Sequence, residues 1–156
     1  MSDNMALDQG QLENWLNRAG ISHYICDQCN GLHLSGLQEL EGVVDSRLFI
    51  ESWGILLSTE LVIRPVALLP IVADLGRLNI DYPTLKLFLD IVDEAMPQLA
   101  VGATQLSGAG LNEAQFRLFI TTTMEAVRQL ASECDHLDYL LPDEDAEQNP
   151  RPVRVH

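Results

Sequence analysis

The chain has 156 residues, of which 47% are hydrophobic, and this indicates one folded domain with its own core rather than a disordered protein. Nine basic residues face 23 acidic ones, for a formal net charge of −14. Affinity for nucleic acid and for anionic membranes depends on Lys and Arg, so the charge argues against both as partners. It favours a protein partner with a basic patch.

No part of the sequence indicates export or insertion into a membrane. The first 25 residues lack a basic stretch followed by an apolar run, so no signal peptide is expected. No apolar segment reaches the roughly 20 residues needed to cross a bilayer, because Arg64 and Pro65 interrupt the longest candidate, 61–69. Three cysteines are an odd number, which fits reduced thiols. We therefore expect a cytoplasmic protein.

The first expected elements are a helix and a β-hairpin. Asp8 is a suitable N-cap, and Gly20 is placed to end the helix. Its apolar positions follow helical spacing: Leu12, Trp15, Leu16 and Ala19. Residues 22–26 and 32–35 are predicted to be short strands around a turn that contains the dipeptide Asn30-Gly31.

Two longer strands are expected next. Residues 43–51 alternate between apolar and charged side chains, whereas residues 55–63, after a turn at Gly54, are more uniformly apolar. This contrast predicts an antiparallel pair in which the first strand lies at the edge of the sheet and the second at its centre.

A helix is expected to open at Arg64-Pro65 and to run to about Asn79. Pro70 either kinks this helix or marks where regular α structure begins. The first ten residues of the segment are apolar all round, so it must be buried on more than one side. One side can be the sheet of the same domain. The other can be a second subunit or further parts of the same chain, and both alternatives stay open.

The C-terminal part adds two strands, a helix and a tail. Strands are predicted at 84–92 and 98–106, and Asn112 caps a last helix with Gln115 at the capping-box position. We expect one domain over residues 1–142 and a disordered acidic tail over 143–156. The order α-β-β-β-β-α-β-β-α, with strands in runs, predicts an α+β fold with an antiparallel sheet.

The motif with most chemical content is Cys26, Cys29 and His33, a spacing typical of zinc ligands and redox dithiols. A structural zinc usually has four ligands, and Cys134 or His136 could supply the fourth. However, the motif is expected in a hairpin beside large apolar residues, where free cysteine packs as a small hydrophobe, and a redox pair normally opens a helix. We therefore expect no metal and no cofactor; Cys26, Cys29 and His33 remain the metal candidates.

Other polar groups form no catalytic arrangement. Residues 107–111 join a strand to a helix as a phosphate-binding turn would, but the third glycine and the lysine are missing. Asp90, Asp93 and Glu94 are expected to be solvated. No nucleophile and orienting acid accompany the histidines His23, His33, His136 and His156. Arg64 is expected to bind carbonyl groups or an acid, with a partner contact as the alternative. The chain is therefore not expected to be an enzyme.

Three groups of residues carry a resemblance to a known family: Cys26-Asp27-Gln28-Cys29 with Leu32-His33-Leu34, Arg64-Pro65 with Leu69-Pro70 and Ala73-Asp74-Leu75, and Lys86-Leu87-Phe88-Leu89-Asp90. In this order and spacing they resemble the enterobacterial branch of the YbjN family, from about residue 11 to residue 142. The resemblance implies a regulator of virulence, exopolysaccharide production and stress responses. It also implies a fold similar to class I type III secretion chaperones, which are acidic dimers that bind partners without catalysis.

A homodimer with an unidentified protein partner follows from this resemblance, and the helix that begins at Pro65 offers the interface. The expected interface residues are Val66, Leu68, Leu69, Val72 and Leu75. The alternative function, from a different class, is a thiol- or zinc-based sensor that uses Cys26 and Cys29.

Overall fold

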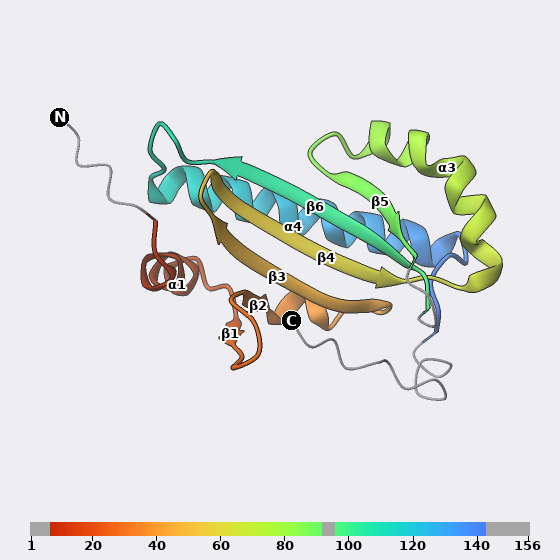
Figure 1. Cartoon of the computed structure of the whole chain (residues 1–156), viewed down its shortest axis with the longest axis horizontal. Helices are drawn as coiled ribbons and strands as arrows, with labels where there is room; N and C mark the ends of the chain where they lie inside the picture. Colours follow the sequence, from red (N-terminus) through yellow and green to blue (C-terminus); the bar gives the residue numbers. More distant parts are fainter. Residues whose placement is uncertain (1–6, 92–95, 143–156) are drawn as a thin grey trace.

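A six-stranded antiparallel sheet beside a long C-terminal helix is the centre of the computed structural model, which describes residues 7–91 and 96–142 (Figure 1). The elements in chain order are α1 (Gln9–Arg18), β1 (His23–Ile25), β2 (Leu32–Leu34), α2 (Ser35–Gln38), β3 (Val43–Glu51), β4 (Gly54–Val62), η1 (Pro65–Ala67), α3 (Leu68–Asp81), β5 (Lys86–Asp90), β6 (Gln98–Leu106) and α4 (Glu113–His136). The predicted α+β class, with its antiparallel sheet, is confirmed.

The helix caps read from the sequence are present. The Asp8 carboxylate accepts the backbone N–H of Gln11 at 2.8 Å, and Gly20 follows α1 with φ +71°. At α4, the Asn112 side chain accepts the Gln115 N–H at 2.8 Å, and the Gln115 side chain accepts the Asn112 N–H at 2.9 Å. This reciprocal pair is a complete capping box, so the start of α4 is fixed by four neighbouring residues.

Pro70 does not kink the helix that was predicted to begin at Arg64-Pro65. A short 3₁₀ turn, η1, precedes α3, and Pro70 is the third residue of α3. The N–H groups of the first helical turn have no partner within the helix, so a proline at this position costs no hydrogen bond. Of the two alternatives for Pro70, the structure has the one in which it marks the beginning of regular α structure.

The predicted position of residues 43–51 at the sheet edge is wrong. The strand order is β1-β2-β3-β4-β6-β5, so β3 lies between β2 and β4. The hairpin formed by β1 and β2 docks on β3 through the pairs Leu32↔Leu48 and His33↔Arg47. Only β4 has the predicted place, at the centre of the sheet between β3 and β6.

A β-bulge at the start of β3 changes which side chains face the core. Val43 pairs with Leu61 and Asp45 pairs with Glu60, so Val44 is an extra residue without a partner on β4. In a regular strand, Val43 and Asp45 would point to the same face. With the bulge, Val43 is buried in the core cluster while Asp45 is only partly buried. The bulge thus releases Asp45 to the other face of the sheet.

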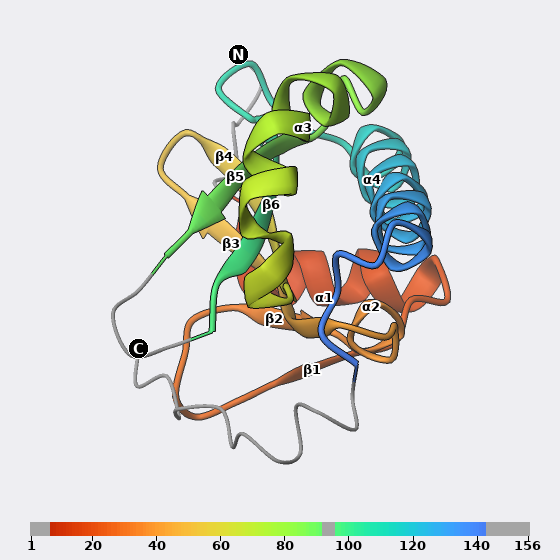
Figure 2. The same ribbon diagram turned by 90° about the vertical axis from the view of Figure 1, so that its right-hand side faces the viewer.

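One face of the sheet carries the core, and α4 runs along it (Figures 1 and 2). The fully buried side chains of the central strands and of α4 include Ile55, Leu57, Leu61, Leu99, Phe116, Ile120 and Val127. The side chains that alternate with them on β3 and β4, such as Phe49, Leu56 and Ser58, are only partly buried. None of the described helices is long and apolar enough to span a bilayer.

Candidate functional site

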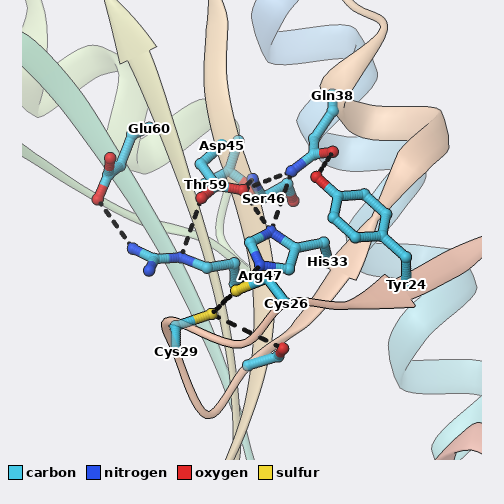
Figure 3. A network of polar contacts seen from close by, with 11 residues as sticks. Tyr24, Cys26, Cys29, His33, Gln38, Asp45, Ser46, Arg47, Thr59 and Glu60 are labelled. Carbon is cyan, nitrogen blue, oxygen red and sulfur yellow. Dashed lines mark hydrogen bonds and ion pairs between the residues drawn. The ribbon is translucent and has the colours of Figure 1, made fainter. Parts of the chain in front are cut away.

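The hairpin of β1 and β2 brings together the three groups that the sequence spaces as zinc ligands (Figure 3). The Sγ atoms of Cys26 and Cys29 lie 3.0 Å apart, and Nε2 of His33 lies 3.1 Å from the first sulfur and 3.2 Å from the second. Both cysteines are half-buried and the histidine is buried. The expectation that these thiols pack as small hydrophobes is wrong, because they face each other and an imidazole.

Strand pleating explains this arrangement. Tyr24 pairs with His33 across the hairpin, so both point to one face, and Cys26 follows Tyr24 by two residues. Leu32 and Leu34 point to the opposite face and are buried in the core. The leucines that stand beside His33 in the sequence therefore pack away from the thiols.

Gly31 allows the hairpin to lie close to β3. A Cβ at this position would come 2.9 Å from Cε1 of Phe49 and 3.2 Å from Cβ of Arg47. Any other residue would require the side chains of Phe49 and Arg47 to shift. Gly31, which belongs to the dipeptide that predicted the turn, thus also sets the distance between the thiols and the residues of β3.

Asp45 orients the imidazole of His33. Its Oδ1 atom lies 3.0 Å from Nδ1 of His33 and also accepts the Ser46 N–H at 2.8 Å and a Gln38 side-chain N–H at 2.5 Å. A carboxylate only accepts hydrogen bonds, so in the neutral imidazole the proton lies on Nδ1. In that neutral form the lone pair of Nε2 faces the two sulfurs, as a metal ligand requires, whereas in the doubly protonated ring Nε2–H donates to the sulfurs.

Tyr24 and Gln38 hold the ring in place. The ring of Tyr24 stacks on the imidazole of His33, with centroids 4.6 Å apart and planes 4° from parallel (Figure 3). Its hydroxyl donates to Oε1 of Gln38 at 2.7 Å. Because Gln38 donates in turn to Asp45, the stack and the hydrogen bonds close around His33. Gln38 belongs to α2, a four-residue helix that the sequence did not predict.

Arg47 places a buried cation beside this cluster. Its Nε atom lies 3.4 Å from Oδ2 of Asp45, and a terminal nitrogen lies 3.6 Å from Oε1 of Glu60 (Figure 3). Its guanidinium lies 5.2 Å from the centre of the Phe49 ring. The carboxylate that orients His33 is therefore balanced by a neighbouring positive charge.

The thiol of Cys26 is activated. Hydrogen bonds with Cys29 first, then with His33 and with the backbone N–H of Gln28, lower its pKa from 9.0 to about 7. At neutral pH a large share of this group is thiolate, the form that binds metals and attacks electrophiles.

Cys134 and His136 do not complete a four-ligand set. Among residues 7–91 and 96–142, the group that could hold a metal ion consists of Cys26, Cys29 and His33. Cys134 is buried in the core on α4, where burial above all raises its pKa to about 12. His136, also on α4, lies beside Asp74 and Arg77 of α3. The proposed fourth ligand is therefore not available from α4.

Arg64 has the expected role at a chain junction, since its Nε donates to the carbonyl of Leu140 at 3.0 Å.

The predicted strand at 84–92 is shorter in the structure, which gives β5 as Lys86–Asp90. Asp93, Glu94, His156 and the predicted tail at 143–156 lie outside the described residues.

A second feature is the exposed side of η1 and α3. Of the expected interface residues, Val66, Leu69 and Val72 are 83%, 78% and 52% exposed, whereas Leu68 and Leu75 pack partly against the core. Exposed residues of α3 repeat at helical spacing and form what we call the α3 stripe: Leu69, Val72, Ala73, Gly76 and Ile80. The sequence analysis missed Ile80, which is 77% exposed.

A network of ion pairs joins α3 to α4 behind this stripe. Arg77 binds Asp74 through two N–H groups at 2.7 and 2.8 Å, Asp81 at 2.8 Å and Glu133 at 2.9 Å. The Tyr139 hydroxyl also donates to Asp74, at 2.9 Å. The i,i+3 and i,i+4 spacings of Asp74, Arg77 and Asp81 were visible in the sequence, but the contact with α4 was not.

The comparisons with known proteins agree with this fold. The profile of the YbjN family, described as "Putative bacterial sensory transduction regulator", matches residues 8–136. The YbjN proteins of Escherichia coli (strain K12) and Shigella flexneri are each 35% identical to this chain over 138 residues, which cover 88% of this chain and 87% of the relative. The crystal structure of YbjN from E. coli, described as "a putative transcription regulator", matches with a TM-score of 0.84 and 32% identity over 90% of this chain and 99% of that chain. The chain therefore belongs to the YbjN family.

Proposed function

We propose that the chain is a non-enzymatic regulator that acts in the cytoplasm by binding other proteins, in the control of virulence, exopolysaccharide production and stress responses. The family description supports a regulatory role, and the resemblance to the enterobacterial, AmyR-like branch supports these processes. The observation that carries the proposal is the α3 stripe, because a contiguous exposed apolar face typically marks a surface that binds protein.

The occupant that we propose for the α3 stripe is a second copy of the chain. Two copies with a charge of −14 each repel one another, so they need a contact without charge. The α3 stripe has no charged residue, and Arg77 next to it is engaged by three carboxylates. A Cβ on Gly76 would meet nothing within 4 Å, so a second helix can approach closely there. A two-fold axis at this point would make the stripe complementary to itself.

The dimer would then present other surfaces to a protein partner. The net charge of −14 favours a partner with a basic patch and disfavours direct contact with DNA or RNA. This distinguishes the proposal from regulation through DNA binding by the chain itself.

Light scattering of the full chain at micromolar concentration tests the dimer. We expect the wild type to have the mass of two chains and Leu69→Glu the mass of one, because a buried carboxylate in an apolar interface is strongly unfavourable. The matched control is Leu118→Glu, since Leu118 is a helical leucine that is 69% exposed on α4. Circular dichroism confirms that both variants fold. A monomeric wild type, or equal dissociation by both variants, would overturn the assignment.

Complementation in the native cell tests the regulatory role. Loss of the protein should alter exopolysaccharide production, and Leu118→Glu should restore it while Leu69→Glu does not. Equal restoration by the two variants would show that the α3 stripe is not needed for regulation.

A further inference from the structure

We propose that Cys26, Cys29 and His33 form a three-ligand site for Zn²⁺ whose fourth position is open to an exchangeable ligand. This site is independent of the α3 stripe, and neither the family description nor the relatives assign it. The inference rests on the donor set, its geometry, the groups that orient it and its exposure.

The donor set selects a thiophilic ion. Two thiolates and one imidazole are soft or borderline ligands, which suit Zn²⁺ and do not suit Mg²⁺ or Ca²⁺. Two thiolates also neutralise the charge of the ion, so the site needs no further carboxylate. The carboxylate of Asp45 does not face the sulfurs as a ligand, because it is used by His33 and by the adjacent cation of Arg47.

The geometry is close to that of a tetrahedral face. Bond lengths of about 2.3 Å for Zn–S and about 2.0 Å for Zn–N place tetrahedral ligands about 3.5–3.8 Å apart. The three ligand atoms here are separated by 3.0, 3.1 and 3.2 Å. Around an ion of these bond lengths, the distance between the two sulfurs must widen by about 0.8 Å and each sulfur–nitrogen distance by about 0.3–0.4 Å, shifts that side-chain torsions can provide.

The surroundings of His33 resemble those of a ligand in a metal site. Metal-bound histidines usually donate their second N–H to a carboxylate or carbonyl, which fixes the tautomer and the ring orientation. Here Nδ1 of His33 faces Asp45, which two further donors hold, and Tyr24 stacks on the ring.

The fourth position is exposed. In the described part of the chain no fourth cysteine, histidine or carboxylate joins the cluster, and both cysteines are half-buried on the surface of the hairpin. Closed structural zinc sites have four protein ligands, whereas three-ligand sites bind water or an incoming group in the fourth position. In the isolated protein we assign this position to water.

Zinc titration of the full chain, reduced and stripped of metal, tests the site. In competition with a chromophoric chelator, we expect one Zn²⁺ per chain. Cys29→Ser and His33→Gln should each weaken binding more than about 100-fold, beyond the effect of losing an orienting group. Cys134→Ala is the matched control, because it removes a cysteine outside the cluster and should leave the affinity unchanged. Substoichiometric binding, or equal affinity in Cys29→Ser, would overturn the proposal.

Cobalt substitution tests the coordination independently of affinity. Co²⁺ should give the intense visible bands of a tetrahedral ion and a thiolate charge-transfer band, both absent in Cys29→Ser. Weak octahedral bands without charge transfer would contradict the assignment. A reduced chain that binds no Zn²⁺, but forms a Cys26–Cys29 disulfide under mild oxidation, would also overturn it and indicate a redox pair instead.

Asp45 is a positioning residue in this proposal. Asp45→Asn should weaken Zn²⁺ binding about 10–100-fold, with a Co²⁺ spectrum that stays tetrahedral. A drop in thermal stability with unchanged Zn²⁺ affinity would show that Asp45 is only structural.

Discussion

Two regions of this molecule combine a cysteine with charged groups, and they give that cysteine opposite properties. In the β1–β2 hairpin, Cys26 is half-buried and hydrogen bonds from Cys29 and His33 lower its pKa to about 7. At the end of α4, Cys134 is buried next to Glu133, and burial raises its pKa to about 12. Solvent access and hydrogen bonding, rather than the residue type, decide which thiol can react.

The largest expected difference between the two regions is in alkylation of the metal-free, reduced protein. A lowered pKa means that Cys26 is mostly thiolate above pH 7, so its rate should rise with pH around a midpoint near 7. Cys134 stays protonated until about pH 12. Even after correction for the lower nucleophilicity of a low-pKa thiolate, the rates at pH 7 should differ by roughly 100-fold or more. Iodoacetamide labelling followed by peptide mass spectrometry measures both sites in one sample.

Unfolded protein is the control for that comparison, since all three cysteines should then react at similar rates. Equal labelling of Cys26 and Cys134 in the folded chain would remove the distinction between the two regions.

The hairpin should be sensitive to a single added methyl group. Gly31→Ala places a Cβ 2.9 Å from the ring of Phe49, so we expect a loss of about 1–3 kcal/mol in the free energy of unfolding, as for overpacked cores. Gly36→Ala in α2 is the matched control, because its Cβ would come no closer than 3.8 Å to Arg128 and alanine favours helix. Urea unfolding followed by circular dichroism measures both. If the two variants are equally stable, the close approach of the hairpin to β3 is wrong.

A smaller effect is expected at the junction of α3 and α4. Arg77→Ala leaves Asp74, Asp81 and Glu133 without their common cation, so it should lower the free energy of unfolding by more than the loss of a single surface ion pair does, although the 45% exposure of the Arg77 side chain limits the effect. Added salt should reduce the difference between wild type and variant, because it screens partly exposed charges. Arg18→Ala, which breaks one exposed pair with Glu113, should cost less than 1 kcal/mol, as an isolated surface pair does. Thermal unfolding at two salt concentrations compares them, and equal costs would contradict a shared network.

Local patterns were enough for much of the fold. The caps at Asp8 and Asn112 and the periodicity of α4 depend on residues close in the sequence, and the structure has them where predicted. The predicted edge position of residues 43–51 was wrong because β2 pairs with the outer side of β3. This pairing was not predictable, since β1 and β2 have three residues each and are too short to show a clear alternation of apolar and polar side chains.

The candidate site was only half accessible from the sequence. The spacing of Cys26, Cys29 and His33 identified the metal candidates, but their apolar neighbours in the chain suggested burial. Those neighbours alternate to the other face of the hairpin. Asp45 is twelve residues from His33, and its orientation depends on a β-bulge that has no recognisable signal in the sequence. The interaction between them therefore became visible only in three dimensions.

That bulge sets the phase of β3. Because Val44 is one residue too many for the ladder, the segment before it and the segment after it are out of step by half a pleat. Deleting Val44 would restore one continuous period, and the chain would have to choose between keeping Val43 in the core and keeping Asp45 beside His33. The unpaired residue Val44 thus allows one strand to place Val43 in the hydrophobic core and Asp45 beside the polar hairpin.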